Sequence, residues 1–379
     1  MLGDVRGYAA RMPQATTDVP PGGAGRRPSG ARPFGAMPDG REVTLHRIGV
    51  APGPVAEVLD LGATLHRLEI RGGDGMVRNV VLSHPSVESR LLSPFYLGGT
   101  IGRYANRIAR GRFELDGADV QVRTHDRGNA LHGGPDGFDR RLWEVVSRSA
   151  SSIELALTSP DGDQGYPGTL RARARYEVVD DGSPGWLRAT YSATADAPTV
   201  VNLTNHAYVN LDGEGSGPVD DHTLQVRASR YTPVDPDGIP VGDHAPVDGT
   251  PFDLRESRAV GVVVRDPHPE IEGFGGIDHN FVLDPGRPGA LGLAAVLRSA
   301  RSRTFLELHT DQPGLQVHTG NGFDGTAVGP SGRAYDRWHG IALEPQLHPD
   351  TPHHPDWPTA VLRPGQTYVS TIEWRFLHD

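Results

Sequence analysis

Alternating apolar and polar residues dominate the chain from about Phe34 to its end, and this pattern predicts strands. The alternation is clearest in seven segments, which begin at Ile153, Leu170, Trp186, Thr223, Thr304, Gly314 and Thr367. Each is bounded by Gly, Pro, Asp or Asn, as strands joined by tight turns are. No stretch of a dozen residues has helical periodicity, and only a short helical turn near residues 86–92 is expected. The pattern predicts an all-β protein.

Many strands without intervening helices imply antiparallel sheets that pack face to face or close on themselves. The 49 Gly and 33 Pro supply turns at short intervals. No repeat and no break in composition divides the patterned part, so we predict one large β domain over residues 34–379. Residues 1–33 are rich in Gly, Pro, Ala and Arg. They bury too little apolar surface to offset their ordering entropy, and we expect a disordered tail.

Composition removes several classes of function. The formal net charge is −10, which does not favour binding to nucleic acid or to an anionic membrane. All 37 basic residues are arginine, so no lysine can form a Schiff base or act as a general base. Cysteine is absent, which excludes disulfides, thiolate zinc sites and cysteine nucleophiles. No apolar stretch is long enough to span a membrane, and no secretory segment is evident. We expect a cytoplasmic protein.

Polar residues interrupt the alternation at a few dense places. G-R-Y-A-N-R-I contains Asn106 and Arg107, and N-A-L-H-G-G contains His132 before two glycines. Asn106 and Arg107 can hydrogen-bond the hydroxyls of a sugar, and glycines let the backbone approach a ligand closely. Taken alone, the first motif is more typical of a solvated turn, and the second is equally compatible with a turn histidine that has no function. In V-N-L-T-N-H-A-Y, strand alternation would place polar side chains on one face, either solvated or lining a cleft: Asn202, Thr204, His206 and Tyr208.

Three further motifs carry candidate residues. Asp278 stands at the start of the strand-like D-H-N-F-V-L, and Gln316 lies in G-L-Q-V-H-T. Glu344 closes the apolar run of G-I-A-L-E-P-Q, where burial would raise its pKa. The alternative is an edge-strand glutamate paired with an arginine. The histidine-rich segment from His348 has prolines that prevent a helix and lacks ligand spacing, so no metal site is expected there.

In this order, the motifs resemble the aldose 1-epimerase (galactose mutarotase) family. The resemblance runs from about Phe34 to the C-terminus and rests on G-R-Y-A-N-R-I, N-A-L-H-G-G, D-Q-G-Y-P-G, N-L-T-N-H-A-Y, G-I-D-H-N-F, Q-V-H-T-G-N and L-E-P-Q-L-H-P-D. It implies a large antiparallel β-sandwich, the galactose mutarotase-like supersandwich, with no cofactor and no metal. It also implies an isomerase that interconverts the α and β anomers of free aldohexoses such as glucose and galactose.

The resemblance carries roles over to matching positions. Glu344 would be the general base and His206 the general acid. Sugar contacts would fall on Asn106, Arg107, His132, Asp278 and Gln316. Tyr208 is a further candidate, because an aromatic face can stack on a sugar; the same holds for Trp338, which can equally belong to the core. Relatives often carry small or amide residues at the positions of His353 and His354, which leaves the sugar specificity open.

Other functions remain compatible with these residues. A hexose-6-phosphate 1-epimerase would need a cluster of arginines around the phosphate. A non-catalytic sugar-binding protein can be built on the same fold. A glycoside hydrolase would use two carboxylates, such as Glu344 and Asp278, but would leave the histidine motif without a role. We expect a small-molecule aldose as the partner, and a monomer or a homodimer.

Overall fold

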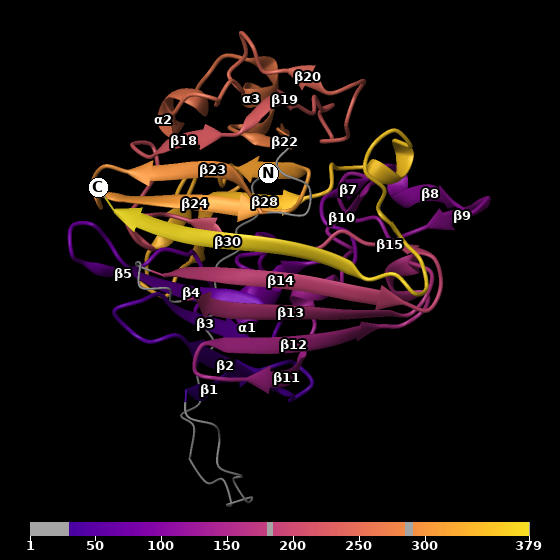
Figure 1. Cartoon of the computed structure of the whole chain (residues 1–379), viewed down its shortest axis with the longest axis horizontal. Coiled ribbons are helices and arrows are strands. Elements are labelled where there is room, and N and C mark those ends of the chain that lie inside the picture. The colour runs from indigo at the N-terminus through magenta and orange to yellow at the C-terminus, as the bar shows by residue number, and fades with distance from the viewer. Residues whose placement is uncertain (1–29, 180–184, 285–290, 379) are drawn as a thin grey trace, which may run out of the picture.

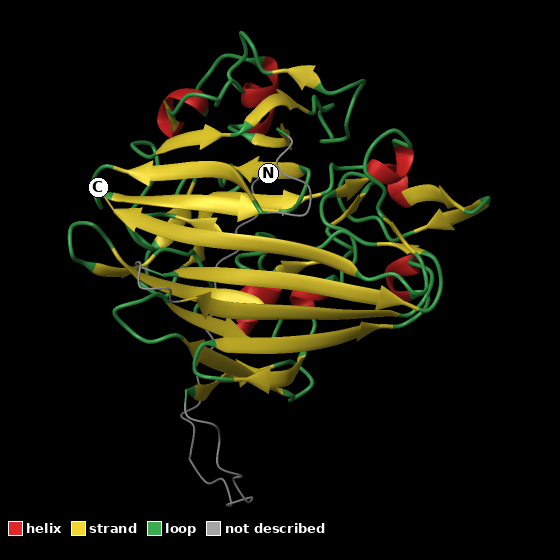
Figure 2. Cartoon of the chain, in the orientation of Figure 1, coloured by secondary structure: helices red, strands yellow, loops and turns green. Residues whose placement is uncertain are grey.

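The computed structural model describes residues 30–179, 185–284 and 291–378, and strands make up most of it (Figures 1 and 2). All the ladders between its named strands are antiparallel, so the predicted all-β antiparallel fold is confirmed. Within these residues the α-helices are short: α1 (Val87–Leu92), α2 (Val260–Val263) and α3 (Pro269–Phe274). Among the described helices, none has the length and apolar character needed to cross a membrane.

The largest sheet has nine strands, and Figure 1 shows it face-on from β11 at the lower edge to β18 near the top. In spatial order its strands are β11 (Glu144–Arg148), β12 (Ser152–Ser159), β13 (Leu170–Val179), β14 (Trp186–Ala195), β30 (Tyr368–His378), β24 (Thr304–Thr310), β23 (Gly292–Ser299), β18 (Thr223–Val226) and β21 (Arg258–Ala259). Alternation in the sequence predicted five of these strands: β12, β13, β14, β18 and β24. The strand predicted from Thr367 is β30.

A six-stranded sheet carries the residues of most interest. Its spatial order is β17 (Tyr208–Val209), β28 (Ile341–Gln346), β25 (Gly314–His318), β22 (Asp278–Leu283), β19 (Ala228–Tyr231) and β20 (Ala245–Pro246). β25 confirms the strand predicted from Gly314. Three of its strands, β28, β25 and β22, lie side by side although they are far apart in the sequence, and this brings three of the motifs together.

A third sheet is formed by the N-terminal part of the described chain. Its five strands follow in chain order: β1 (Ala31–Ala36), β2 (Glu42–Ile48), β3 (Val55–Leu59), β4 (Thr64–Arg71) and β5 (Val77–Asn79). Because β1 begins at Ala31, the described strand structure starts three residues before the predicted domain boundary at residue 34. The rest of the predicted tail, residues 1–29, lies outside the described residues. A tail followed by a single domain therefore stays a prediction.

Five two-stranded ladders lie outside the three larger sheets among the described residues. They pair β6 (Thr100–Ile101) with β16 (Thr204–Asn205), β7 (Arg107–Ile108) with β10 (Ala130–Leu131), β8 (Arg112–Leu115) with β9 (Ala118–Gln121), β15 (Thr199–Val200) with β29 (Val361–Leu362), and β26 (Asp324–Val328) with β27 (Ala334–Asp336).

The nine-stranded sheet packs over the other two sheets through one hydrophobic core. In β13, Ala172, Ala174 and Tyr176 are fully buried while the intervening arginines point outward, as strand alternation requires. The core joins these side chains to Val58 and Leu65 of the five-stranded sheet. It also includes side chains of the six-stranded sheet: Phe281, Leu315, Val317, Ile341 and Leu343. The molecule is a sandwich, as predicted.

The predicted strand through residues 201–208 is wrong as a single element. The segment instead contains β16 and the start of β17, which pair with different strands, β6 and β28. Asn202 therefore does not share a face with His206. Its amide instead bridges Ala105 O and the backbone N–H of Leu347. The row of polar side chains is broken because this segment crosses between sheets.

Candidate active site

The floor of the site is one face of the strands β28, β25 and β22. In β28, Ile341 and Leu343 point into the core, so alternation turns Glu344 to the opposite face. The register pairs Glu344 with Gln316 on β25. Asp278 on β22 stands opposite His318 on β25. This arrangement collects side chains from three motifs on one surface.

Glu344 is 1% exposed, although it is an ionisable residue in a strand that is buried on both faces. Its Oε1 lies 3.5 Å from Nε2 of His206, and no described residue forms a hydrogen bond with its Oε2. Burial, and after it the charge of Asp278, raises the pKa of Glu344 well above its usual value, while Arg107 opposes the shift. A carboxylate in such surroundings accepts a proton readily.

His206 is held over this floor by its backbone. Its N–H donates to Gly99 O at 3.0 Å, and its carbonyl accepts from the N–H of Gly98 at 2.9 Å. The backbone of Gly98 has a positive φ of +68°, and a Cβ there would lie 2.1 Å from Leu65 O. Only glycine allows this close approach. Burial, and then the neighbouring His318, lowers the pKa of His206 to about 3.

His132 and Asn106 form the wall opposite Glu344. The backbone N–H of Asn106 donates to Nδ1 of His132 at 3.1 Å, and the N–H of His132 donates to Asn106 O at 3.1 Å. Gly133, which follows His132, does not have the predicted role of letting the backbone approach a ligand. A Cβ on Gly133 would lie 2.0 Å from Gly102 O, so Gly133 lets the chain approach its own backbone rather than a ligand.

Arg107, Asp278 and Gln316 supply the polar end of the site. Nε of Arg107 donates to Asp126 Oδ2 at 2.8 Å, which fixes the guanidinium. Nε2 of Gln316 donates to Asp278 Oδ1 at 2.7 Å. Burial alone would raise the pKa of Asp278, but His318, Arg107 and the Gln316 hydrogen bond together lower it below its usual value. Asp278 therefore stays ionised beside the arginine.

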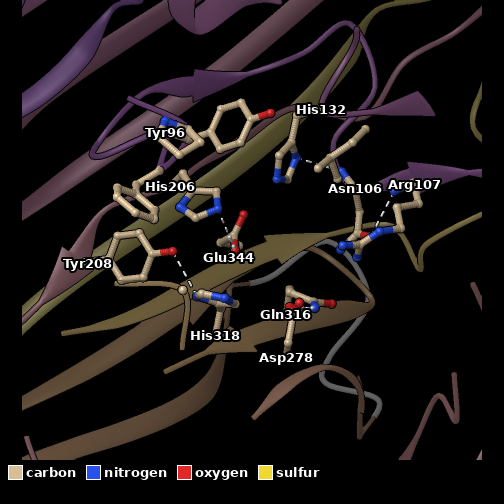
Figure 3. Close-up of a pocket in the computed structure, with 14 residues that line it drawn as sticks. Tyr96, Asn106, Arg107, His132, His206, Tyr208, Asp278, Gln316, His318 and Glu344 are labelled. Carbon is tan, nitrogen blue, oxygen red and sulfur yellow. Dashed lines mark hydrogen bonds and ion pairs between the residues drawn. The ribbon is translucent and has the colours of Figure 1, made fainter. Parts of the chain in front are cut away.

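The eight residues predicted as acid, base or sugar contacts all line one cavity of about 160 Å³ (Figure 3): Asn106, Arg107, His132, His206, Tyr208, Asp278, Gln316 and Glu344. That volume holds several waters, or a small polar molecule in their place. Trp338 does not line it, because it packs against the core and its Nε1 donates to Gly275 O. His353 pairs with Asp350 and His354 stacks on Trp357, so neither lines the cavity.

Two lining residues with polar side chains were not predicted, Tyr96 and His318. His318 lies two positions after Gln316 on β25, so strand alternation alone could have placed it on the same face. Tyr96 lies in the loop after α1, where no periodicity applies. Its ring makes an edge contact with His132, with ring centroids 4.7 Å apart.

Three potential metal ligands come together in this cavity, His132, His206 and Glu344, with ligand atoms within 4.8 Å of one another. The tautomer of His132 opposes a metal. A backbone N–H can only donate, so the bond from Asn106 makes Nδ1 of His132 an acceptor and leaves the proton of the neutral ring on Nε2. Nε2 then donates a hydrogen bond and has no lone pair for a metal ion. The cluster is better suited to a ligand with hydroxyl oxygens.

The fold and the cavity together define a class: a β-sandwich protein with a buried carboxylate and an imidazole poised for acid–base chemistry on a small polar molecule. The chain matches the aldose 1-epimerase family over residues 49–375. It is 40% identical over 346 residues to aldose 1-epimerase of Escherichia coli K12, covering 90% of this chain and 97% of that protein. It is 39% identical to galactose mutarotase of Mus musculus, with the same coverage.

Comparison with solved structures points to the same family. A GalM/aldose epimerase homologue from Caenorhabditis elegans superposes with a TM-score of 0.80 at 29% identity, covering 88% of this chain and 98% of that one. Galactose 1-epimerase from Lactobacillus acidophilus gives a TM-score of 0.78 at 29% identity, covering 92% and 98%. The chain therefore belongs to the aldose 1-epimerase family, as its motifs indicated, and the prediction of an isomerase is confirmed.

Proposed function

We propose that this protein is an aldose 1-epimerase that interconverts the α and β anomers of unphosphorylated aldohexoses such as glucose and galactose, with Glu344 as general base and His206 as general acid. The observation that carries the proposal is the 3.5 Å distance between His206 Nε2 and Glu344 Oε1 inside a cavity lined by hydroxyl-binding groups. The anomeric hydroxyl oxygen O1 and the ring oxygen O5 are both bonded to C1. Two neighbouring groups can therefore reach both oxygens at once.

The reaction begins with ring opening. Glu344 takes the proton from O1, a C1–O1 double bond forms, and the C1–O5 bond breaks with its electron pair moving to O5. His206 gives its Nε2 proton to O5. General acid and general base catalysis contribute typically ~10²–10⁴-fold each. The result is an open-chain aldehyde, a protonated Glu344 and a neutral His206.

Burial favours this distribution of protons. A carboxylate beside an imidazolium becomes a carboxylic acid beside a neutral imidazole. The low-dielectric surroundings disfavour the charged form of each group, so the starting ion pair is the minor arrangement of the one proton that the pair holds, and ring opening neutralises it. The aldehyde then rotates about C1–C2. O5 attacks the other face of C1 while His206 recovers its proton and Glu344 returns one to O1. The enzyme ends in its starting state, so no reset step is needed.

The remaining polar groups would hold the sugar while C1 reacts. Arg107, His132 Nε2 and the Gln316 amide can bind hydroxyls, and Asp278 can accept from one. No described residue bonds to Gln316 Oε1, although that atom is buried. A buried polar atom without a partner is costly, and a bound hydroxyl would satisfy it. Positioning of this kind brings C1 within reach of the acid and the base.

The geometry disfavours two of the alternatives. Arg107 is the only arginine among the described residues that line the cavity, whereas a phosphate dianion calls for several. A glycoside hydrolase needs carboxyl groups on either side of the scissile bond. Glu344 and Asp278 would take those two roles, and His206, whose Nε2 lies 3.5 Å from Glu344 Oε1, would then have no part in the reaction.

Polarimetry tests the reaction and the substrate class together. Fresh α-D-glucose and α-D-galactose should reach equilibrium rotation faster in proportion to the protein added, and glucose 6-phosphate should respond much less. Saturable sugar binding without any acceleration would favour a non-catalytic binding protein. A preference for glucose 6-phosphate would favour the phosphate-specific alternative.

The pH profile should depend on Asp278 and Arg107 in opposite directions. The active pair holds one proton, so the rate falls at high pH when that proton is lost. The charge of Asp278 raises the pKa of Glu344 and Arg107 lowers it. Asp278→Asn should therefore move the alkaline limb of kcat/KM to lower pH, and Arg107→Met to higher pH. The uncatalysed rate is subtracted at each pH. Unchanged limbs, or shifts of opposite sign, would exclude this electrostatic account.

Metal removal should not affect the rate. The hydrogen bond from Asn106 makes Nε2 of His132 a donor, and acid–base catalysis by Glu344 and His206 requires no metal ion. Dialysis against a chelator should leave kcat and KM for glucose unchanged, with residual metal checked by elemental analysis. Activity that is lost on dialysis and restored by Zn²⁺ would argue for a metal held by His132, His206 and Glu344.

We also propose that the protein is cytoplasmic and works as a monomer or a homodimer. The acid, the base and the predicted sugar contacts line one cavity of a single chain, so the proposed mechanism requires no residue from a second subunit. Cell fractionation and analytical ultracentrifugation check the location and the oligomeric state.

A further inference from the structure

His318 lines the cavity, yet the acid–base mechanism gives it no role. It is the last residue of β25 and lies on the same strand face as Gln316. It is partly buried, and its ring centroid is 6.3 Å from that of His206. An imidazole beside a reacting sugar can donate or accept a hydrogen bond, and which of the two it does depends on its tautomer.

Two hydrogen bonds fix that tautomer. The backbone N–H of Gly320 donates to Nδ1 of His318 at 3.2 Å, and the Tyr208 hydroxyl lies 2.8 Å from the same atom. Because a backbone N–H can only donate, Nδ1 is an acceptor, and the proton of the neutral ring is on Nε2. Tyr208 must then donate its hydroxyl hydrogen to Nδ1. The packing of Tyr208 against Phe323, with ring centroids 4.9 Å apart, holds this hydroxyl in place.

The other ring nitrogen is left for a ligand. No described residue accepts a hydrogen bond from Nε2 of His318. Directly across the ladder stands Asp278, and residues paired in this way have Cβ atoms roughly 5 Å apart. Oδ1 of Asp278 already accepts from Gln316. Figure 3 shows the His318 ring between Tyr208 and the Asp278–Gln316 pair. An N–H donor and an anionic acceptor thus lie side by side at the cavity surface.

We propose that His318 and Asp278 together bind one hydroxyl of the sugar other than O1, with His318 Nε2–H donating to its oxygen and the Asp278 carboxylate accepting its hydrogen, so that His318 is a determinant of sugar specificity. The inference rests on the proposed function, which assigns O1 and O5 to Glu344 and His206. A hydroxyl of inverted configuration cannot meet both groups. A site built to bond a hydroxyl discriminates strongly against sugars in which that hydroxyl is missing or misplaced.

Deoxy sugars provide the test. Mutarotation of glucose and of its 2-, 3-, 4- and 6-deoxy analogues is followed with the wild-type protein and with His318→Leu. We expect kcat/KM for glucose to fall roughly tenfold, the value of one hydrogen bond of ordinary strength. One deoxy sugar, the one that lacks the bound hydroxyl, should show almost no further loss on substitution. The other analogues should lose as much as glucose does.

Two further variants make the result decisive. His318→Gln can place an amide N–H near the position of Nε2 and should retain more activity on glucose than His318→Leu. If the leucine variant does not fold, the glutamine variant is compared with the wild type across the same sugars. His309→Leu is the matched control, because His309 lies on β24 outside the cavity.

Equal losses on all sugars would show a merely structural effect and overturn the proposal, as would no loss on glucose. A wild-type protein that accelerates none of the sugars would instead contradict the proposed function. The two failures are therefore distinguishable.

Discussion

Replacing Glu344 by glutamine is expected to lower kcat/KM for glucose by roughly 10²–10⁴-fold, the usual contribution of a general base. Glutamine has the shape of glutamate and can still hydrogen-bond O1, but it cannot take the proton from O1. Glu344 is 1% exposed, so water cannot easily replace it. The loss should appear in kcat, while the Kd for the sugar should change little.

Polarimetry gives the rate of this variant and isothermal titration calorimetry gives its Kd. Glu307→Gln is a matched control, because Glu307 lies on β24 outside the cavity and should tolerate the change. A Glu344→Gln variant that turns over at the wild-type rate would remove Glu344 from the reaction. A large loss of binding with unchanged kcat would make it a binding residue instead.

Replacing His206 by asparagine should also cost roughly 10²–10⁴-fold in kcat, because asparagine cannot deliver a proton to O5. The two backbone hydrogen bonds to Gly98 and Gly99 do not involve the side chain, so the local chain path should survive. Stopped-flow or conventional polarimetry measures the rate, and His309→Asn provides the control outside the cavity. A negligible loss would exclude His206 as the general acid.

The double variant adds a stricter condition. Groups that act as one unit give strongly non-additive effects, because the second substitution removes a function that is already lost. Glu344→Gln combined with His206→Asn should therefore be much less impaired than the product of the two single losses. Losses that multiply fully would mean that the two residues act independently.

Strand alternation predicted much of the fold, because β13 and β14 have one face in the core and the other in water. Leu170 and Ala172 alternate with exposed arginines, and that contrast is visible in the sequence. The same logic failed over residues 201–208. Here both faces are buried and the chain crosses between sheets. The polarity of a side chain therefore no longer shows which face of the strand it lies on. Tertiary packing overrides the local pattern at such crossings.

The candidate site, like the fold, was predicted only in part from the sequence. Resemblance to a family pointed to seven residues and the stacking argument added Tyr208, and the fold places all eight around one cavity. What the sequence could not supply was their mutual arrangement, such as the hydrogen bond from Asn106 that sets the tautomer of His132. Tyr96 was invisible because it lies in a loop, where burial follows no period. His318 was within reach of the alternation rule but was overlooked.

The measurement that most directly tests the central claim is nuclear magnetic resonance exchange spectroscopy of [1-¹³C]glucose at anomeric equilibrium in D₂O. If Glu344 and His206 open and reclose the ring at C1, exchange between the α and β signals should rise in proportion to the wild-type protein. Deuterium should enter neither C1 nor C2, because no C–H bond is broken. No added exchange, or deuterium appearing at C2, would contradict the account.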